Sequence, residues 1–194
     1  MFNAAIDLVL TGGQVVMQRL VSAWTTLPTF QDWAIAALLL GMYAAVVLPL
    51  GFRQRFLQVH DFLPWPQMVV VLGASVLSPG LSEELLYRVV LLPHPAEQPA
   101  AIAWWGWNSL SLGVFVLSHL LSAYSFFPAA RSTFVQPVFL VMAGILGVVC
   151  AIAYQQSGSL WTPVFVHWLI VVIWLLRLGG YQKLYAKERG LNKI

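Results

Sequence analysis

The sequence is poor in charge. Asp, Glu, Lys and Arg make up 9% of its 194 residues, whereas an ordinary soluble domain has about a quarter. Residues of the set AVILMFWYC make up 60%, and the mean hydropathy is +0.80. So few charges cannot cover a soluble globule of this length, and so much apolar surface excludes intrinsic disorder. The composition predicts an integral membrane protein whose single domain is an all-α, polytopic transmembrane helix bundle.

Cysteine is almost absent, and the basic residues are unevenly placed. The one cysteine, Cys150, lies in an apolar run and excludes an intramolecular disulfide. The net charge is +3, from ten Lys and Arg against seven Asp and Glu, and five of the ten basic residues lie at or after Arg177. The excess therefore belongs to a basic tail, and we expect no nucleic-acid partner.

Five apolar stretches each approach the roughly 20 residues that a helix needs to cross a bilayer. They cover residues 32–52, 67–92, 102–123, 134–156 and 160–178. Pro79-Gly80 predicts a break in the second stretch, with a new helix from Leu81. Apolar residues recur at helical spacing over 1–27, which favours an N-terminal amphipathic helix lying in the membrane interface, with a sixth span as the alternative.

The domain organisation follows from these stretches. We expect an N-terminal interfacial segment over 1–30, a transmembrane helical domain over 31–178 and a basic tail over 179–194. Lys and Arg alternate between successive connections, with Arg53 and Arg55 after the first span and none near 93–101. This pattern predicts that the basic C-terminus is cytoplasmic. Membrane lipid is the first expected partner.

Ionisable side chains inside membrane spans are costly, so each is a functional candidate. The second span carries Glu83, Glu84 and Arg88. Glu84 and Arg88 are i,i+4 neighbours that can pair, which leaves Glu83 without a local cation. A carboxylate in that position can act as a general base. The alternative is a surface turn in which both carboxylates cap a helix end.

Two histidines complete the candidate set. His119 shares a helix face with Phe115 and a stripe of small polar residues, and the alternative reading is a packing stripe in which His119 bonds a backbone carbonyl. His167 lies one turn after Pro163, and could equally anchor the aromatic belt beside Trp168. Counted along straight spans, Glu83, His119 and His167 lie at depths staggered by roughly 14 Å.

One carboxylate and two imidazoles can perform amide hydrolysis. Glu83 with His119 can hold and deprotonate a water, and His167 can donate to the oxyanion of a tetrahedral intermediate. The same residues could ligate zinc, although the usual HExxH spacing is missing. A proton relay in a transporter is a further alternative, which the lack of an internal repeat disfavours.

Three motifs in order, each on its own apolar stretch, resemble the CPBP family, also called Abi or CAAX-protease-like. They are Glu83-Glu84-x-x-x-Arg88, Phe115-x-x-x-His119, and His167 after Gly158-Ser159-Leu160-Trp161-Thr162-Pro163. The resemblance covers about residues 67–178 and implies an all-helical glutamic intramembrane protease. It implies that Glu83 and His119 activate water, that Glu84 and Arg88 support the site, and that His167 helps to form the oxyanion site.

The sequence departs from the family pattern at one position. The family often has an Asn four residues after the third-motif His, where this chain has Val171, which cannot donate a hydrogen bond. We therefore predict an intramembrane glutamic endopeptidase that acts on peptides or membrane proteins and needs no cofactor. The alternatives are a non-catalytic partner-binding or immunity protein of the same fold, and a zinc-dependent membrane hydrolase.

Overall fold

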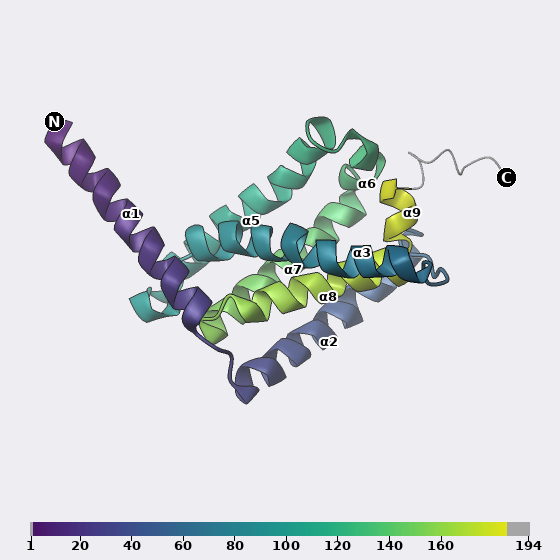
Figure 1. Cartoon of the computed structure of the whole chain (residues 1–194), viewed down its shortest axis with the longest axis horizontal. Coiled ribbons are helices and arrows are strands. Elements are labelled where there is room, and N and C mark those ends of the chain that lie inside the picture. The colour runs from purple at the N-terminus through teal and green to yellow at the C-terminus, as the bar shows by residue number, and fades with distance from the viewer. Residues whose placement is uncertain (1, 186–194) are drawn as a thin grey trace.

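The computed structural model describes residues 2–185, with side chains from residue 12 onward, and every regular element in that range is helical. This confirms the predicted all-α fold. The longer helices are α1 (Phe2–Thr25), α2 (Phe30–Arg53), α3 (Trp65–Ser75), α5 (Ala101–Tyr124), α7 (Pro137–Ser157) and α8 (Trp161–Arg177). Figure 1 shows α3 and α8 running side by side, α5 inclined to both, and the start of α1 pointing away from the bundle. Most of the predicted basic tail, residues 186–194, lies outside the described residues.

Short local signals set the helix ends. Thr29 and Asp32 form a capping box at the start of α2, in which the Thr29 amide donates to Asp32 Oδ2 at 2.7 Å. Pro137 opens α7, at a position where a missing N–H costs nothing. Residues around Phe134 belong to a separate short helix, α6 (Arg131–Phe134), so the fourth predicted span begins three residues later than expected. Gly158 ends α7 with φ +62°, which favours glycine.

The second predicted span is broken where Pro79 predicts it. Ser78 is extended, with φ −141° and ψ 118°, since a residue before proline avoids the helical region. The chain then passes through η1 (Val76–Leu81), α4 (Ser82–Glu84) and η2 (Leu85–Val90). Segment η1 is a kink between two helical stretches, since it contains the extended Ser78, whereas η2 is π-helical. Widened helical turns of this kind occur often at functional sites. Glu83, Glu84 and Arg88 all lie in this irregular stretch.

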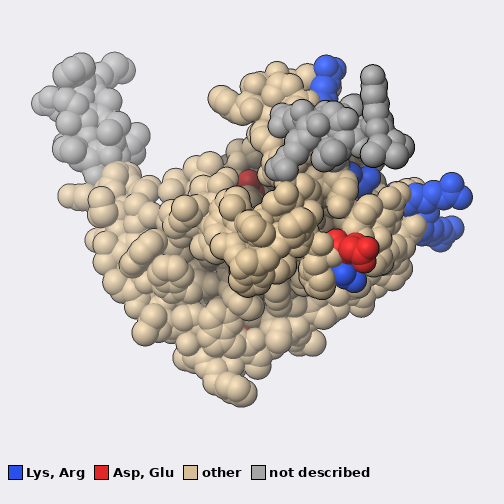
Figure 2. Space-filling view, turned by 45° about the vertical axis from the view of Figure 1, so that its right-hand side comes forward, with Lys and Arg blue, Asp and Glu red and all other residues tan. Residues whose placement is uncertain are grey.

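Three described segments are long and apolar enough to cross a membrane by themselves: Phe30–Arg53, Trp65–Glu97 and Pro137–Ser157. Helix α5 qualifies together with Pro128–Phe134, from which it is bent by 107°, and α8 is a shorter apolar helix. Each predicted span thus corresponds to a helix, while the number of about five crossings stays a prediction. Figure 2 shows Lys and Arg on one side of a largely uncharged face.

Helix α7 lies at the centre of the bundle and packs against α2, α5 and α8. Its small residues Ala143, Gly147 and Ala151 let these neighbours come close. A Cβ added at Gly147 would lie 2.7 Å from Leu112 and 3.2 Å from Phe115 on α5. The close approach of α5 to α7 therefore holds Phe115 in place beside Arg88 and His167.

Candidate active site

A buried polar network joins the second and fifth predicted spans. Arg88 Nε donates to Glu84 Oε2 at 3.0 Å, which confirms the expected i,i+4 pair. His167 Nδ1 lies 2.7 Å from Glu84 Oε1, and since a carboxylate only accepts, the ring nitrogen is the donor. The side chains of Glu84 and Arg88 are fully buried and that of His167 is 3% exposed. Burial excludes the alternatives of a solvent-exposed cap for Glu84 and a belt anchor for His167.

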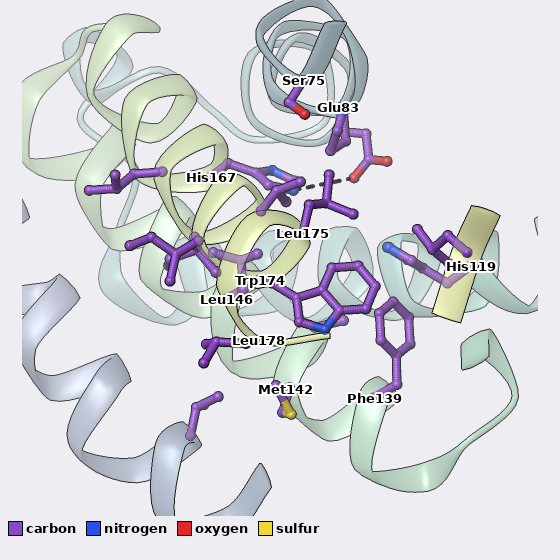
Figure 3. Close-up of a pocket in the computed structure, with 18 of the residues that line it drawn as sticks. Ser75, Glu83, His119, Phe139, Met142, Leu146, His167, Trp174, Leu175 and Leu178 are labelled. Carbon is purple, nitrogen blue, oxygen red and sulfur yellow. Dashed lines mark ion pairs between the residues drawn. The ribbon is translucent and has the colours of Figure 1, made fainter. Parts of the chain in front are cut away.

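Glu83 points away from its neighbour and into a pocket. Its Oε2 atom lies 3.9 Å from His167 Nε2 (Figure 3), and no hydrogen-bond partner for that oxygen is found among the described residues. The Glu83 side chain is 27% exposed, whereas Glu84 is fully enclosed. His167 thus uses one nitrogen to bind a structural carboxylate and turns the other toward a second carboxylate that borders open space.

His119 reaches the same pocket from α5. Its Nδ1 donates to the Phe115 carbonyl at 2.9 Å, so the backbone bond considered from the sequence does form. That bond directs Nε2 away from the helix backbone. The ring is held edge-on by Phe115 and Phe134, with centroids at 4.8 and 5.6 Å, and by Phe139 at 5.4 Å. The imidazole is both a packed side chain and part of the pocket wall (Figure 3).

Phe115 packs between the buried Arg88–Glu84–His167 network and His119. It is 1% exposed, and its ring lies 5.4 Å from the Arg88 guanidinium carbon and 6.2 Å from the His167 ring. Tyr87 packs edge-on to it at 5.1 Å. A guanidinium over an aromatic face is electrostatically favourable. Phe115 therefore helps to fix the positions of Arg88, His119 and His167 together.

Glu83, His119 and His167 line one pocket of about 820 Å³. The His119 and His167 rings lie 4.8 and 6.2 Å from the same Phe115 ring, so the depth stagger of roughly 14 Å inferred from straight, parallel spans is wrong. Two features remove it: the break at Ser78 re-directs the segment carrying Glu83, and α5 is inclined to α8 (Figure 1). Val171, at the position of the family Asn, lines the pocket with an aliphatic side chain.

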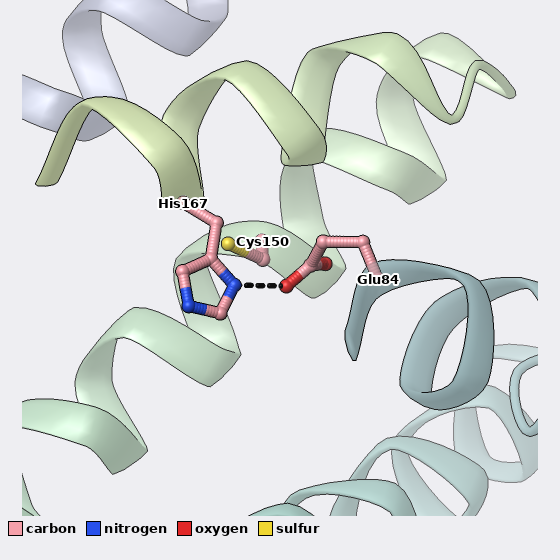
Figure 4. Close-up of side chains that lie close together, drawn as sticks. All are labelled: Glu84, Cys150 and His167. Carbon is pink, nitrogen blue, oxygen red and sulfur yellow. Dashed lines mark hydrogen bonds and ion pairs between the residues drawn. The ribbon is translucent and has the colours of Figure 1, made fainter. Parts of the chain in front are cut away.

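Cys150 is a neighbour of the site that the sequence reasoning missed. One possible ligand atom from each of Glu84, Cys150 and His167 lies within 4.8 Å of the other two (Figure 4). Among the described residues, these three form the group that could hold a metal ion. Of the three ligands that the zinc hypothesis named, the group includes His167 but neither Glu83 nor His119. Both Glu84 oxygens already bind Arg88 and His167, and a guanidinium repels a cation, so these residues fit a hydrogen-bonded network better than zinc.

Two further polar contacts fix the elements that carry the site. Trp168 Nε1 donates to the Leu72 carbonyl at 3.0 Å and ties α8 to α3. Ser111 donates to the Tyr87 carbonyl at 2.6 Å and ties α5 to η2. The stripe of small polar residues on the third predicted span indicated that Ser111 faces protein. No sequence pattern predicted the hydrogen bond from Trp168 to Leu72.

Comparison with known proteins identifies the family. A family model described as type II CAAX prenyl endopeptidase Rce1-like matches residues 64–173, more than half of the chain and the part that carries all three motifs. Searches of curated proteins and of solved structures found no match. Membership supports a membrane endopeptidase and an integral membrane location. The chain therefore belongs to the Rce1-like family of type II CAAX prenyl endopeptidases.

Proposed function

We propose that this protein is a glutamic-type intramembrane endopeptidase, which hydrolyses peptide bonds with water activated by Glu83 and His119. The observation that carries the proposal is the convergence of Glu83, His119 and His167 on one pocket from three separate helices. Burying ionisable side chains inside a membrane protein costs free energy, so such residues more often have a chemical role than a packing role.

Charge balance gives each group a role. Arg88 and Glu84 neutralise one another at 3.0 Å, so their pair leaves the rest of the cluster neutral. His167 Nδ1 donates to Glu84, and Nε2 lies 3.9 Å from Glu83 Oε2, so a proton placed on Nε2 faces the Glu83 carboxylate. In that state Nε2–H is a donor for an oxyanion that forms beside Glu83.

The reaction then proceeds in two steps. Glu83, assisted by His119 Nε2, takes a proton from water while the water oxygen bonds to the carbonyl carbon of the substrate, and His167 donates to the resulting oxyanion. The intermediate collapses as the C–N bond breaks, and the proton held by Glu83 passes to the leaving amine. A carboxylic acid and an amine are released, with no metal required.

Replacement of Glu83 by Gln tests the proposal. The substitution keeps the shape of the side chain and removes the base, so turnover of a peptide library in detergent should fall below detection while thermal unfolding stays near that of the wild type. Asp61→Asn, at an exposed connection remote in sequence from the motifs, is the matched control. Normal turnover by Glu83→Gln would rule out the proposed base.

A non-catalytic, partner-binding protein of the same fold is the second candidate, favoured by Val171. An aliphatic side chain lines the pocket where the family motif supplies an amide donor. If the wild type cleaves no peptide of the same library and specifically captures a membrane partner, this second candidate is supported.

A further inference from the structure

The N-terminal helix α1 packs on the segment that carries the buried arginine of the site. Helix α1 lies outside residues 64–173, which the family model matches, yet it packs against η2. Ala23 of α1 is fully buried and belongs to one apolar cluster with Val89 and Leu92. The end of α1 therefore shares a core with the π-helical turn that holds Arg88.

Arg19 joins α1 to the chain around the end of η2. Its Nε and Nη2 atoms donate to the two Glu97 carboxylate oxygens at 2.6 and 2.7 Å, and its Nη1 donates to the Val90 carbonyl at 3.2 Å. A guanidinium that binds a carboxylate through two parallel N–H groups is fixed in orientation. The Arg19 side chain is 17% exposed, so bulk water has limited access to these bonds.

The Val90 carbonyl is the part of η2 that Arg19 holds. Val90 is the last residue of η2, and at a helix end carbonyl groups lack helical partners and a cationic donor is favourable. The Leu92 amide, two residues further on, donates to the Arg88 carbonyl at 3.1 Å. The bond from Arg19 thus fixes the backbone two residues from Arg88, whose side chain is fully buried against Glu84.

The end of α1 also holds the start of the helix that carries His167. The Leu160 amide donates to the Ala23 carbonyl at 2.8 Å. Trp161 Nε1, at the first residue of α8, donates to the Trp24 carbonyl at 3.0 Å, and Figure 1 shows the end of α1 beside the start of α8. Both bonds satisfy carbonyls that a helix end leaves unpaired. Helix α1 is therefore bonded to η2 and to α8, two of the segments that meet in the buried network.

We propose that α1 is a brace for the active site and that Arg19 is its positioning residue, which holds η2, and with it Arg88, in place. This inference rests on the proposed function and gives a role in it to a helix outside the family match. Neither Arg19 nor Val90 lines the pocket. Arg19 therefore acts through the backbone of η2 and not by contact with the substrate.

Hydrogen exchange tests the brace independently of activity. Arg19→Gln removes the guanidinium at a partly exposed position, so the protein should still fold. The amides of residues 85–92 should exchange about tenfold faster in this variant, as the loss of one charge-assisted hydrogen bond allows, while amides in the centre of α7 keep the wild-type rate. Arg53→Gln, at an exposed arginine on the last residue of α2, is the matched control and should leave both rates unchanged.

Steady-state kinetics separate positioning from stability. Glu97→Gln removes the same ion pair as Arg19→Gln, so both variants should lower the melting temperature by a similar amount. Arg19→Gln should lower kcat about tenfold with KM near the wild-type value, as misplacement of a site does. Glu97→Gln should lower kcat less, because its Arg19 can still donate to the Val90 carbonyl.

The two readouts distinguish a failure of the brace from a failure of the proposed function. If exchange of 85–92 rises in Arg19→Gln but the wild type cleaves no peptide, the brace of the buried network stands and the protease is refuted. If the wild type cleaves peptides and Arg19→Gln leaves either the exchange of 85–92 or kcat at its wild-type value, the inference is wrong and the protease stands. Equal losses of kcat in the Arg19 and Glu97 variants would also overturn the positioning role, because the ion pair would then act through stability alone.

Discussion

Val171→Asn should increase peptidase activity, because it supplies the donor that the family motif has and this chain lacks. Position 171 follows His167 by four residues, so the two side chains are separated by about 40° around the helix and about 6 Å along it. Both line the pocket. An Asn amide at 171 can therefore donate to an oxyanion that also accepts from His167 Nε2.

The size of the gain follows from the general value of one oxyanion donor. Removing such a donor costs about 10²–10³ in kcat, or about 2.7–4 kcal/mol. We expect a gain toward that range in kcat and little change in KM, because the bond forms with the transition state and not with the bound substrate. Val171 is half-buried beside the pocket, so the new amide has open space on one side.

The assay compares kcat and KM on the best substrate from a peptide library, in detergent and in nanodiscs. Ile173→Asn is the control, since position 173 lines the pocket but lies about 240° around α8 from His167. An equal gain for both variants would indicate a general polarity effect. A folded Val171→Asn protein with unchanged kcat would refute the assignment of the oxyanion to this face of α8.

Two stability predictions follow from the packing around the site. Glu84→Gln removes the negative charge that neutralises the buried Arg88 and should destabilise the protein by about 3–5 kcal/mol. Adding Arg88→Met should recover part of the loss in thermal unfolding, and an unchanged Glu84→Gln midpoint would refute the pair. Gly80→Ala places a Cβ 2.9 Å from the Ser75 carbonyl oxygen and should cost about 1–3 kcal/mol. Gly106→Ala, where a Cβ meets open space, should cost nothing, and equal melting points for the two variants would refute the clash.

Features that depend on local chemistry were predictable from the sequence. The shortage of charge predicts the membrane class, and Pro79 predicts the break, because proline restricts the residue before it whatever surrounds them. The pairing of Glu84 with Arg88 follows from helical periodicity alone. The proline break and the i,i+4 pair act over one turn or less, so tertiary structure does not override them.

Features that depend on how helices cross were not predictable. The bond from His167 to Glu84 joins residues 83 positions apart, and only the packing of α8 against the broken segment brings them together. The depth of His119 in the membrane depends on the inclination of α5, and counting residues along a span does not give that inclination. In the sequence, Cys150 is indistinguishable from the other apolar residues of α7. Only the folded structure places its sulfur beside Glu84 and His167.

A double-mutant cycle on Glu83 and His119 tests the central claim most directly. If both groups act on one water, Glu83→Gln and His119→Ala should each lower kcat by at least about 10²-fold. The double variant should then be no slower than the slower single variant, because residues that act as a unit are strongly non-additive. Losses that multiply in the double variant, or a single variant that keeps wild-type turnover, would contradict the claim.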